Sequence, residues 1–380
     1  MIKVKDYKIK RYRMRGKLLY TVLLGLGLAA CQPTSHVPDE LNMLVGTYTG
    51  KGSEGIYTFR FDQANGTATP LDSAKVTNPS YVIPSVDGTL VYAVTETSDS
   101  TAALNSYRFD KVTGKLAYIN TELTFGEDPC YIGTNGKIAV TANYTGGSMT
   151  VFPIAPDGSL QPADTVFCGT IGGPDLSRQD SPHVHCTYFS PDGKYIFATD
   201  FSADRIIRYD LSNNAVRPTE SEVVTTLNAD YGPRHIEFSA DGTHAYVVGE
   251  LSDDITVMDY ADGRLTPKQV INGSDAGGRG GADIHLSPNG KFLYASHRLK
   301  EDGISIFSVA ADGTLTKVGY QPTGIHPRNF NITPNGKYLL CACRDSDVIQ
   351  VYEINPQTGL LKDTKQDIHV SQVVCVKFVE

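Results

Sequence analysis

A hairpin signature that recurs about every 48 residues is the feature that most constrains how this chain can fold. Each copy carries a tight-turn sequence, usually Asp-Gly or Asn-Gly, followed by a polar residue and a short apolar strand. These dipeptides favour short hairpins because the turn requires a positive φ. Successive turn glycines lie 48, 57, 49, 48 and 46 residues apart, at Gly88, Gly136, Gly193, Gly242, Gly290 and Gly336.

A second element, a strand with alternating apolar residues, follows each hairpin. It occurs seven times, whereas the hairpin occurs six times. The first repeat unit is incomplete, because residues 44–47 correspond only to the second strand of a hairpin. The chain ends with an isolated apolar strand at 373–378. Joined together, the two ends complete a seventh unit. The sequence therefore predicts an all-β fold, a seven-bladed β-propeller of four-stranded blades closed by pairing of its N- and C-terminal strands. A solenoid or two sandwiches would not explain the split unit.

The N-terminus has the pattern of an export signal. Eight basic residues lie between Lys3 and Lys17, and an apolar run follows at 18–30, too short for an ordinary membrane span. The run ends in Leu-Ala-Ala-Cys, which resembles a bacterial lipobox with Cys31 as the lipidated residue. We predict a signal peptide at 1–30, a polar tether at 31–41 and the propeller at 42–380. An uncleaved anchor helix is the alternative.

Charge and cysteine content exclude other classes of function. Without its signal the chain has 26 basic and 41 acidic residues, a formal charge of −15, which argues against nucleic-acid binding. Gln32, in place of the Asp that holds lipoproteins at the inner membrane, favours an outer-membrane anchor in the cell envelope. The six other cysteines match no zinc motif. Cys341 and Cys343 are two apart on one strand, a poor disulfide geometry, so we expect buried thiols.

Residues that lie the same number of positions before or after each turn glycine should occupy equivalent places in successive blades. These places lie at the end of the blade opposite the turn. The resulting set is rich in charged and polar side chains that should point at one axial opening. Eight residues back lie Ser80, Asp128 (or Cys130), His185, Arg234, Ala282 and Arg328. Eight residues forward lie Glu96, Tyr144, Phe201, Glu250, Arg298 and Arg344.

Two interpretations of these residues are open at this point. They could form salt bridges between blades, or they could form a functional site, because charges buried near an axis are costly without partners or a role. The excess of arginine favours an anionic ligand, since guanidinium groups bind carboxylate and phosphate in bidentate geometry. The same arginines would repel a cation from Glu96, Glu250, Asp128 and Asp283, so we predict neither metal nor cofactor.

At these residues the chain resembles the lactonase family of seven-bladed propellers, which includes propeller-type 6-phosphogluconolactonases and the fungal carboxymuconate cyclase. The resemblance covers nearly all of the chain beyond the signal and does not separate lactonase from cyclase. It is carried by segments 44–49, 55–57, 78–81, 182–185, 232–235, 295–298 and 326–330.

The resemblance implies a site of one His, two Arg and one Glu, which correspond here to His185, Arg234, Arg298 and Glu250. The repeat offsets select the same four positions. The implied activity is hydrolysis of a small anionic sugar lactone, 6-phosphogluconolactone or a related aldonolactone. A carboxymuconate-type cyclase and a non-catalytic propeller that binds a glycan or protein are the alternatives. The closed ring offers no strand edge to a partner, so we expect a monomer.

Lactone opening suggests a role for each residue. His185 or Glu250 would be the general base and the other the proton donor, while Arg234 would stabilise the oxyanion. Arg298 and Arg328 would hold the anionic group of the substrate. The remaining expected substrate contacts are Glu96, Asp283 and Tyr144. The export signal conflicts with a phosphorylated cytoplasmic substrate, so an unphosphorylated lactone stays open.

Overall fold

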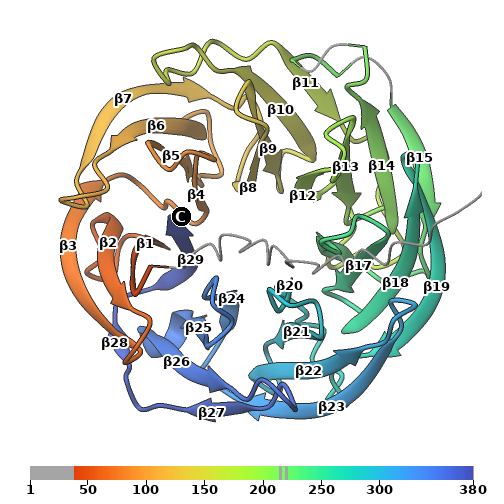
Figure 1. Ribbon diagram of the computed structural model, residues 1–380. Helices are drawn as coiled ribbons and strands as arrows, with labels where there is room; N and C mark the ends of the chain where they lie inside the picture. Colours follow the sequence, from red (N-terminus) through yellow and green to blue (C-terminus); the bar gives the residue numbers. More distant parts are fainter. Residues whose placement is uncertain (1–37, 214–215, 219–220, 380) are drawn as a thin grey trace, which may run out of the picture. The chain divides into compact units, whose positions relative to one another are not determined.

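The computed structural model describes residues 38–213, 216–218 and 221–379. Seven antiparallel sheets stand in a ring, each with one strand at the centre and one at the rim (Figure 1). The predicted signal peptide, Cys31 and most of the predicted tether lie outside the described residues. Among the residues that are described, no helix has the length and apolar character required to cross a bilayer.

Six blades run from the centre to the rim in chain order. The first three comprise β4 (Val82–Pro84), β5 (Leu90–Thr95), β6 (Ala103–Phe109), β7 (Leu116–Leu123); β8 (Pro129–Thr134), β9 (Ile138–Asn143), β10 (Ser148–Pro153), β11 (Thr165–Cys168); and β12 (Val184–Phe189), β13 (Tyr195–Asp200), β14 (Arg205–Asp210), β15 (Ser221–Thr226). The next three comprise β16 (Pro233–Phe238), β17 (His244–Gly249), β18 (Asp254–Ala261), β19 (Arg264–Asn272); β20 (Ile284–Leu286), β21 (Phe292–His297), β22 (Gly303–Val309), β23 (Leu315–Pro322); and β24 (Pro327–Ile332), β25 (Tyr338–Cys343), β26 (Val348–Ile354), β27 (Leu361–Asp363). The sixth also holds the short strand β28 (Ile368–His369) and the 3₁₀ turn η1 (Arg344–Ser346).

The seventh blade joins the two ends of the chain, as the split repeat predicted. Its innermost strand is the C-terminal β29 (Val373–Val379), followed outward by β1 (Glu40–Thr47), β2 (Gly55–Asp62) and β3 (Thr67–Lys75). β29 pairs antiparallel with β1, with Val376 opposite Val45. Both residues are fully buried, so the pairing that closes the ring also completes the core of this blade.

The predicted hairpin turns are confirmed, the expectation of buried thiols is confirmed except at the exposed Cys168, and one boundary is corrected. All six turn glycines have φ between 65° and 81°, the left-handed conformation that favours glycine. The six cysteines after Cys31 are free, and five are buried. β1, however, begins at Glu40, so the last two residues of the predicted tether belong to the propeller. Leu41 is 2% exposed and pairs with Phe61, and burial of this side chain explains why the strand starts early.

Aromatic contacts tie the closing blade to its neighbour. The ring of Phe61 in β2 lies 5.7 Å from that of Phe378 in β29 and 5.9 Å from that of Tyr338 in β25. Phe61 is fully buried, so one side chain links the N-terminal strands, the C-terminal strand and the preceding blade.

We expect Phe61→Ala to destabilise the protein by about 3–5 kcal/mol, because it removes a fully buried ring and leaves a cavity at the closure. Urea unfolding followed by circular dichroism measures the loss. The control is Val112→Ala, at a side chain that is 82% exposed, where the change should stay within about 0.5 kcal/mol. Equal midpoints for both variants would contradict a role of Phe61 in closure.

Candidate active site

A backbone irregularity repeated from blade to blade aims inner-strand residues at the axis. In five inner strands one residue is left out of the ladder with the second strand, which is a β-bulge: Cys130, His185, Arg234, Arg328 and Val374. In three of these a proline precedes the bulged residue, and the residue before that proline has a positive φ: Asp128, Gly232 and His326. A bulge re-aims a side chain and ends regular pairing.

The second strands supply the other half of the site through an equally regular contact. The backbone N–H of each residue eight positions after a turn glycine donates to a carbonyl just before the inner strand. Examples are Glu250 to Gly232 at 2.8 Å and Arg298 to Gly280 at 3.0 Å. Glu96, Tyr144, Phe201 and Arg344 make the same contact. The equal offsets inferred from the sequence therefore correspond to equivalent places in space.

Glu250 lies at the centre of a cluster of three arginines. Its Oε2 accepts from Arg234 Nε at 2.8 Å and lies 3.0 Å from Arg298 Nη2, while its Oε1 accepts from Arg178 Nη2 at 2.5 Å. Burial alone would raise the pKa of Glu250, but the positive charges of Arg298, Arg234 and Arg178 hold it far below the ordinary value. Glu250 is therefore ionised, and both of its oxygens are occupied.

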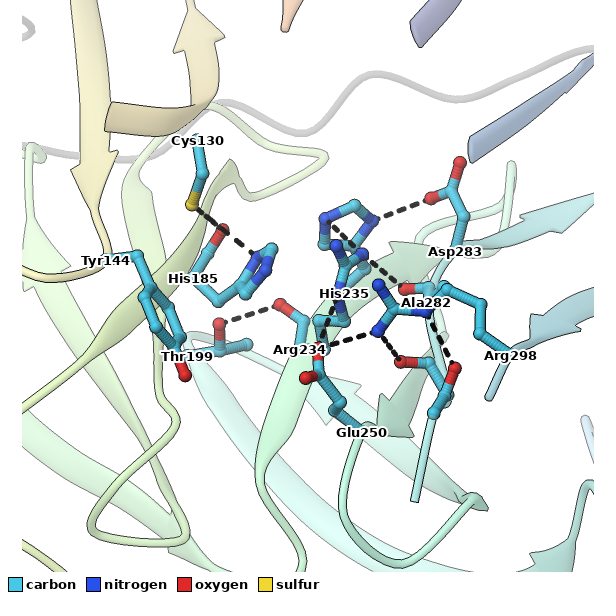
Figure 2. Close-up of polar contacts among 12 residues, drawn as sticks. Cys130, Tyr144, His185, Thr199, Arg234, His235, Glu250, Ala282, Asp283 and Arg298 are labelled. Atoms are coloured by element: carbon cyan, nitrogen blue, oxygen red, sulfur yellow. Dashed lines mark hydrogen bonds and ion pairs between the residues drawn. The ribbon is translucent and has the colours of Figure 1, made fainter. Parts of the chain in front are cut away.

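His185 is a neutral imidazole beside this cluster (Figure 2). It is 4% exposed, and burial, followed by the charge of Arg234, lowers its pKa well below the ordinary range. Its Nδ1 lies 3.7 Å from Cys130 Sγ, and the Cys130 thiol donates to the His185 carbonyl at 3.5 Å. Among the described residues no hydrogen-bond partner is found for Nε2, which leaves this nitrogen able to accept a proton.

Arg234 and Arg298 are held by main-chain carbonyls as well as by Glu250. Arg234 Nη1 donates to the carbonyl of Ala282 at 2.8 Å. Arg298 Nε donates to the carbonyl of Gly280 at 3.0 Å, and its Nη2 to that of Gly281 at 3.2 Å. The glycine-rich segment 277–281, which resembles a phosphate loop only superficially, thus supports Arg298 through its carbonyls.

Arg328 differs from the other arginines because it makes no hydrogen bond or ion pair with any residue that the structure describes. Its guanidinium lies over the ring of Tyr48, 5.6 Å from the ring centre. The Tyr48 hydroxyl donates to Glu96 Oε1 at 2.7 Å, and the Ser80 hydroxyl donates to Glu96 Oε2. Partly exposed and with its donors free, Arg328 can receive an anion.

Tyr144 and Asp283, both expected at the substrate, occupy different kinds of position. The Tyr144 ring stacks on His183 with centres 4.2 Å apart, and it meets His185 edge to face at 5.5 Å. Asp283 is 2% exposed, and its two oxygens face donors from His235, His285, Asn329 and the Phe330 amide. Both oxygens of Asp283 therefore already accept hydrogen bonds within the protein. Asp283 contacts other residues of the site and does not make the substrate contact that the sequence predicted.

Arg178 is the site residue that the repeat offsets missed. It lies in the connection between β11 and β12, within the longest glycine interval, where the repeat predicts nothing about position. Asp175 of the same connection contacts Arg279, which also binds Asp230 at 2.5 Å. These ion pairs hold the connection that carries Arg178 in place. In the part of the chain that the structure describes, no group of three or more His, Cys, Asp or Glu side chains could hold a metal ion.

Comparison with known proteins agrees with this architecture. The model of the family described as lactonase, 7-bladed beta-propeller, matches residues 42–378. The chain belongs to the lactonase family of seven-bladed β-propellers. It is 32% identical over 345 residues to a Bacillus subtilis 6-phosphogluconolactonase, covering 88% of this chain and 97% of the relative.

Two solved structures are similar over most of the chain. A Bacteroides uniformis protein, provisionally named 6-phosphogluconolactonase, is 61% identical with a TM-score of 0.88, covering 90% of this chain and all of the other. The Pseudomonas aeruginosa periplasmic gluconolactonase is 35% identical with a TM-score of 0.84, covering 90% and 99%. The four expected residues of the family, His185, Arg234, Arg298 and Glu250, lie together at the axis (Figure 2).

The ion cluster predicts a specific dependence of stability on pH. Because the folded-state pKa of Glu250 lies below its ordinary value of 4.5, the unfolded chain binds this proton at higher pH than the folded protein does. The stabilisation is complete above that ordinary value and is lost as pH falls toward the folded-state pKa. We expect Glu250→Gln to cost about 3–5 kcal/mol at pH 7, since it leaves buried arginines uncompensated.

Urea unfolding of both proteins between pH 7 and pH 3 measures this effect. Below pH 4.5 the difference between wild type and Glu250→Gln should narrow by about 1.4 kcal/mol per pH unit. Glu222→Gln, which removes an exposed partner of Arg208, is the control and should show almost no difference at any pH. A difference for Glu250→Gln that stays constant down to pH 3 would show that Glu250 is not ionised in the cluster.

Proposed function

We propose that this protein is a lactone hydrolase that opens a sugar lactone, 6-phosphogluconolactone or a related aldonolactone, at the axial site. Its relatives from Bacillus subtilis and Formosa agariphila, both named 6-phosphogluconolactonase, support this reaction, as does the gluconolactonase from Pseudomonas aeruginosa. The observation that carries the proposal is a neutral histidine, His185, that lies within electrostatic range of Arg328, an arginine with no hydrogen-bond partner among the described residues.

His185 is the better general base of the two candidates. Glu250 is ionised, but each of its oxygens already accepts a hydrogen bond or ion pair from arginine, so it has little tendency to take a proton. His185 is neutral and its Nε2 has no partner in the described chain. Burial, and after it the positive charge of Arg234 and Arg328, lowers the pKa of His185, so an anionic substrate bound at Arg328 would offset the part that is due to charge.

The reaction then has a simple proton balance. His185 takes a proton from water as the water oxygen attacks the lactone carbonyl carbon, and Arg234 stabilises the oxyanion that forms. The ring C–O bond breaks, and the departing oxygen takes the proton back from His185. The product is an open hydroxy acid whose carboxyl group ionises at neutral pH. Glu250 holds Arg234 and Arg298 in place throughout.

Arg328 is the preferred site for the anionic group of the substrate. The sequence predicts that Arg298 holds this group together with Arg328, but the donors of Arg298 already contact Gly280, Gly281, His326 and Glu250. Arg328 can instead form a bidentate contact with phosphate or carboxylate. A lactone without phosphate would present no such group, so the two substrates should be assayed side by side.

We expect His185→Gln to lower kcat by about 10²-fold or more, because removal of a general base costs this much while the site remains folded. Release of acid from 6-phosphogluconolactone and from gluconolactone, after subtraction of spontaneous hydrolysis, measures the rate. His369→Gln, an exposed histidine on β28, is the control and should keep full activity. Activity of the wild type on neither lactone would contradict the proposal and favour a non-catalytic binding propeller.

We further propose that Cys31 carries a lipid and anchors the protein in the cell envelope. The support is the basic segment, the apolar run and the Leu-Ala-Ala-Cys sequence that precedes the propeller. The related Pseudomonas aeruginosa protein is described as periplasmic, which agrees with export.

We expect the full-length protein to enter the detergent phase in a Triton X-114 partition and to incorporate labelled fatty acid. Cys31→Ser should do neither, because the thiol is the atom to which the lipid is attached. Cys168→Ser, which changes an exposed cysteine of the propeller, should behave as the wild type. Incorporation of label by Cys31→Ser would refute the anchor.

A further inference from the structure

A buried carboxylate at the axis joins four blades of the ring. Asp283 lies just before β20, and its oxygens accept from His235 Nδ1 at 2.7 Å, His285 Nε2 at 3.1 Å and the Phe330 amide at 3.2 Å. The Asn329 side-chain amide also donates to it. Asn329 Oδ1 in turn accepts from the amide of Val376 in β29 at 2.7 Å. The orientation of Asp283 therefore depends on inner strands β16, β20, β24 and β29.

His235 connects this carboxylate to the candidate active site (Figure 2). Arg234 Nη1 can only donate, so its 3.2 Å contact with His235 Nε2 requires that Nε2 be an acceptor. A neutral imidazole with an acceptor at Nε2 carries its hydrogen at Nδ1, and that hydrogen points at Asp283. The ring of His235 lies 5.3 Å from that of His185. One tautomer of His235 thus satisfies both neighbours, and the other would place two donors face to face.

The surrounding charges keep each group in the required state. Burial and the charge of Arg234 lower the pKa of His235 to about 3, so this ring is neutral at physiological pH. Burial would lower the pKa of His285, but Asp283 and Glu237 raise it to about 9, so His285 is protonated. Burial would raise the pKa of Asp283, yet His285 and His235 hold it well below its usual range. The carboxylate is therefore ionised.

We infer that Asp283 is a positioning residue for lactone opening, which fixes His235 as the Nδ1–H tautomer so that Nε2 holds the guanidinium of Arg234 in place. This inference rests on the proposed function and assigns no direct substrate contact to Asp283. The arrangement is an acidic residue orienting a histidine, which in turn orients the group that meets the substrate. In metal sites, loss of a carboxylate that orients a histidine lowers metal affinity or activity by about 10–100-fold, and we expect an effect of this order here.

Asp283→Asn tests the inference because the amide has nearly the same size but only one acceptor oxygen. With four donors around it, the amide cannot serve both His235 and the remaining partners. We expect the His235 hydrogen to move to Nε2, where it opposes Arg234 Nη1. The expected kinetic result is a kcat lower by about 10-fold or more with KM changed less than about 2-fold, because substrate binding at Arg328 is untouched.

Histidine ¹⁵N chemical shifts give a readout that does not depend on activity. In the wild type, His235 should appear as a neutral Nδ1–H ring from pH 8 to pH 5, and in Asp283→Asn as the Nε2–H ring. Asp200→Asn is the matched control, since Asp200 is 1% exposed and pairs with Arg205 away from the axis. It should leave both the His235 tautomer and kcat unchanged.

The outcomes separate this inference from the proposed function. A wild-type His235 that is protonated or carries its hydrogen at Nε2 overturns the inference even if Asp283→Asn fails to fold. A folded Asp283→Asn variant with an unchanged tautomer and unchanged kcat overturns it as well. If the wild type opens no lactone, the proposed function fails, while the ¹⁵N shifts still decide whether Asp283 orients His235.

Discussion

The pairing of β29 with β1 is the contact on which the rest of the molecule depends. Without it, the inner edge of β1 would be unpaired and the first and last blades would not be brought together. Once the ring is closed, inner strands that are distant in sequence surround a common axis. Phe61, Phe378 and Tyr338 show that this closure is sealed by side-chain packing as well as by strand pairing. The Val376 amide shows that the closing strand also reaches the site, through Asn329 to Asp283.

Concentrating positive charge at the axis is costly, and one carboxylate, Glu250, is shared by three of the arginines there. Arg178, Arg234 and Arg298 all meet Glu250, and two of them also use main-chain carbonyls. This compensation keeps the arginines fixed and their orientation defined, which is a requirement for stabilising a developing negative charge. Arg328 is left outside the cluster and has no hydrogen-bond partner among the described residues, so the proposed roles of substrate binding and positioning fall to different arginines.

The same backbone conformation recurs before several inner strands of the propeller, but the side chains at these positions differ. A residue with positive φ followed by proline stands before Ser80, Cys130, Arg234 and Arg328, and in the last three the inner strand begins at that proline. In the last three, a bulge directs the next side chain toward the axis. The backbone is thus set by requirements of folding, while the residue placed at the bulge is free to vary. This explains why a site can be formed from positions that are equivalent in the repeat but chemically different.

The sequence by itself determined the fold, the closure and four residues of the candidate site, because these follow from local rules repeated at regular intervals. Asp-Gly and Asn-Gly turns require a positive φ wherever they occur, so their spacing counts blades, and equal offsets from them reach His185, Arg234, Glu250 and Arg298. Only the tertiary structure decided the position of Arg178, the freedom of Arg328 and the buried role of Asp283. Arg178 lies in a connection outside the repeat, and the other two depend on which side chains from different blades meet. Such contacts are set by the closed ring and have no periodic signal along the chain.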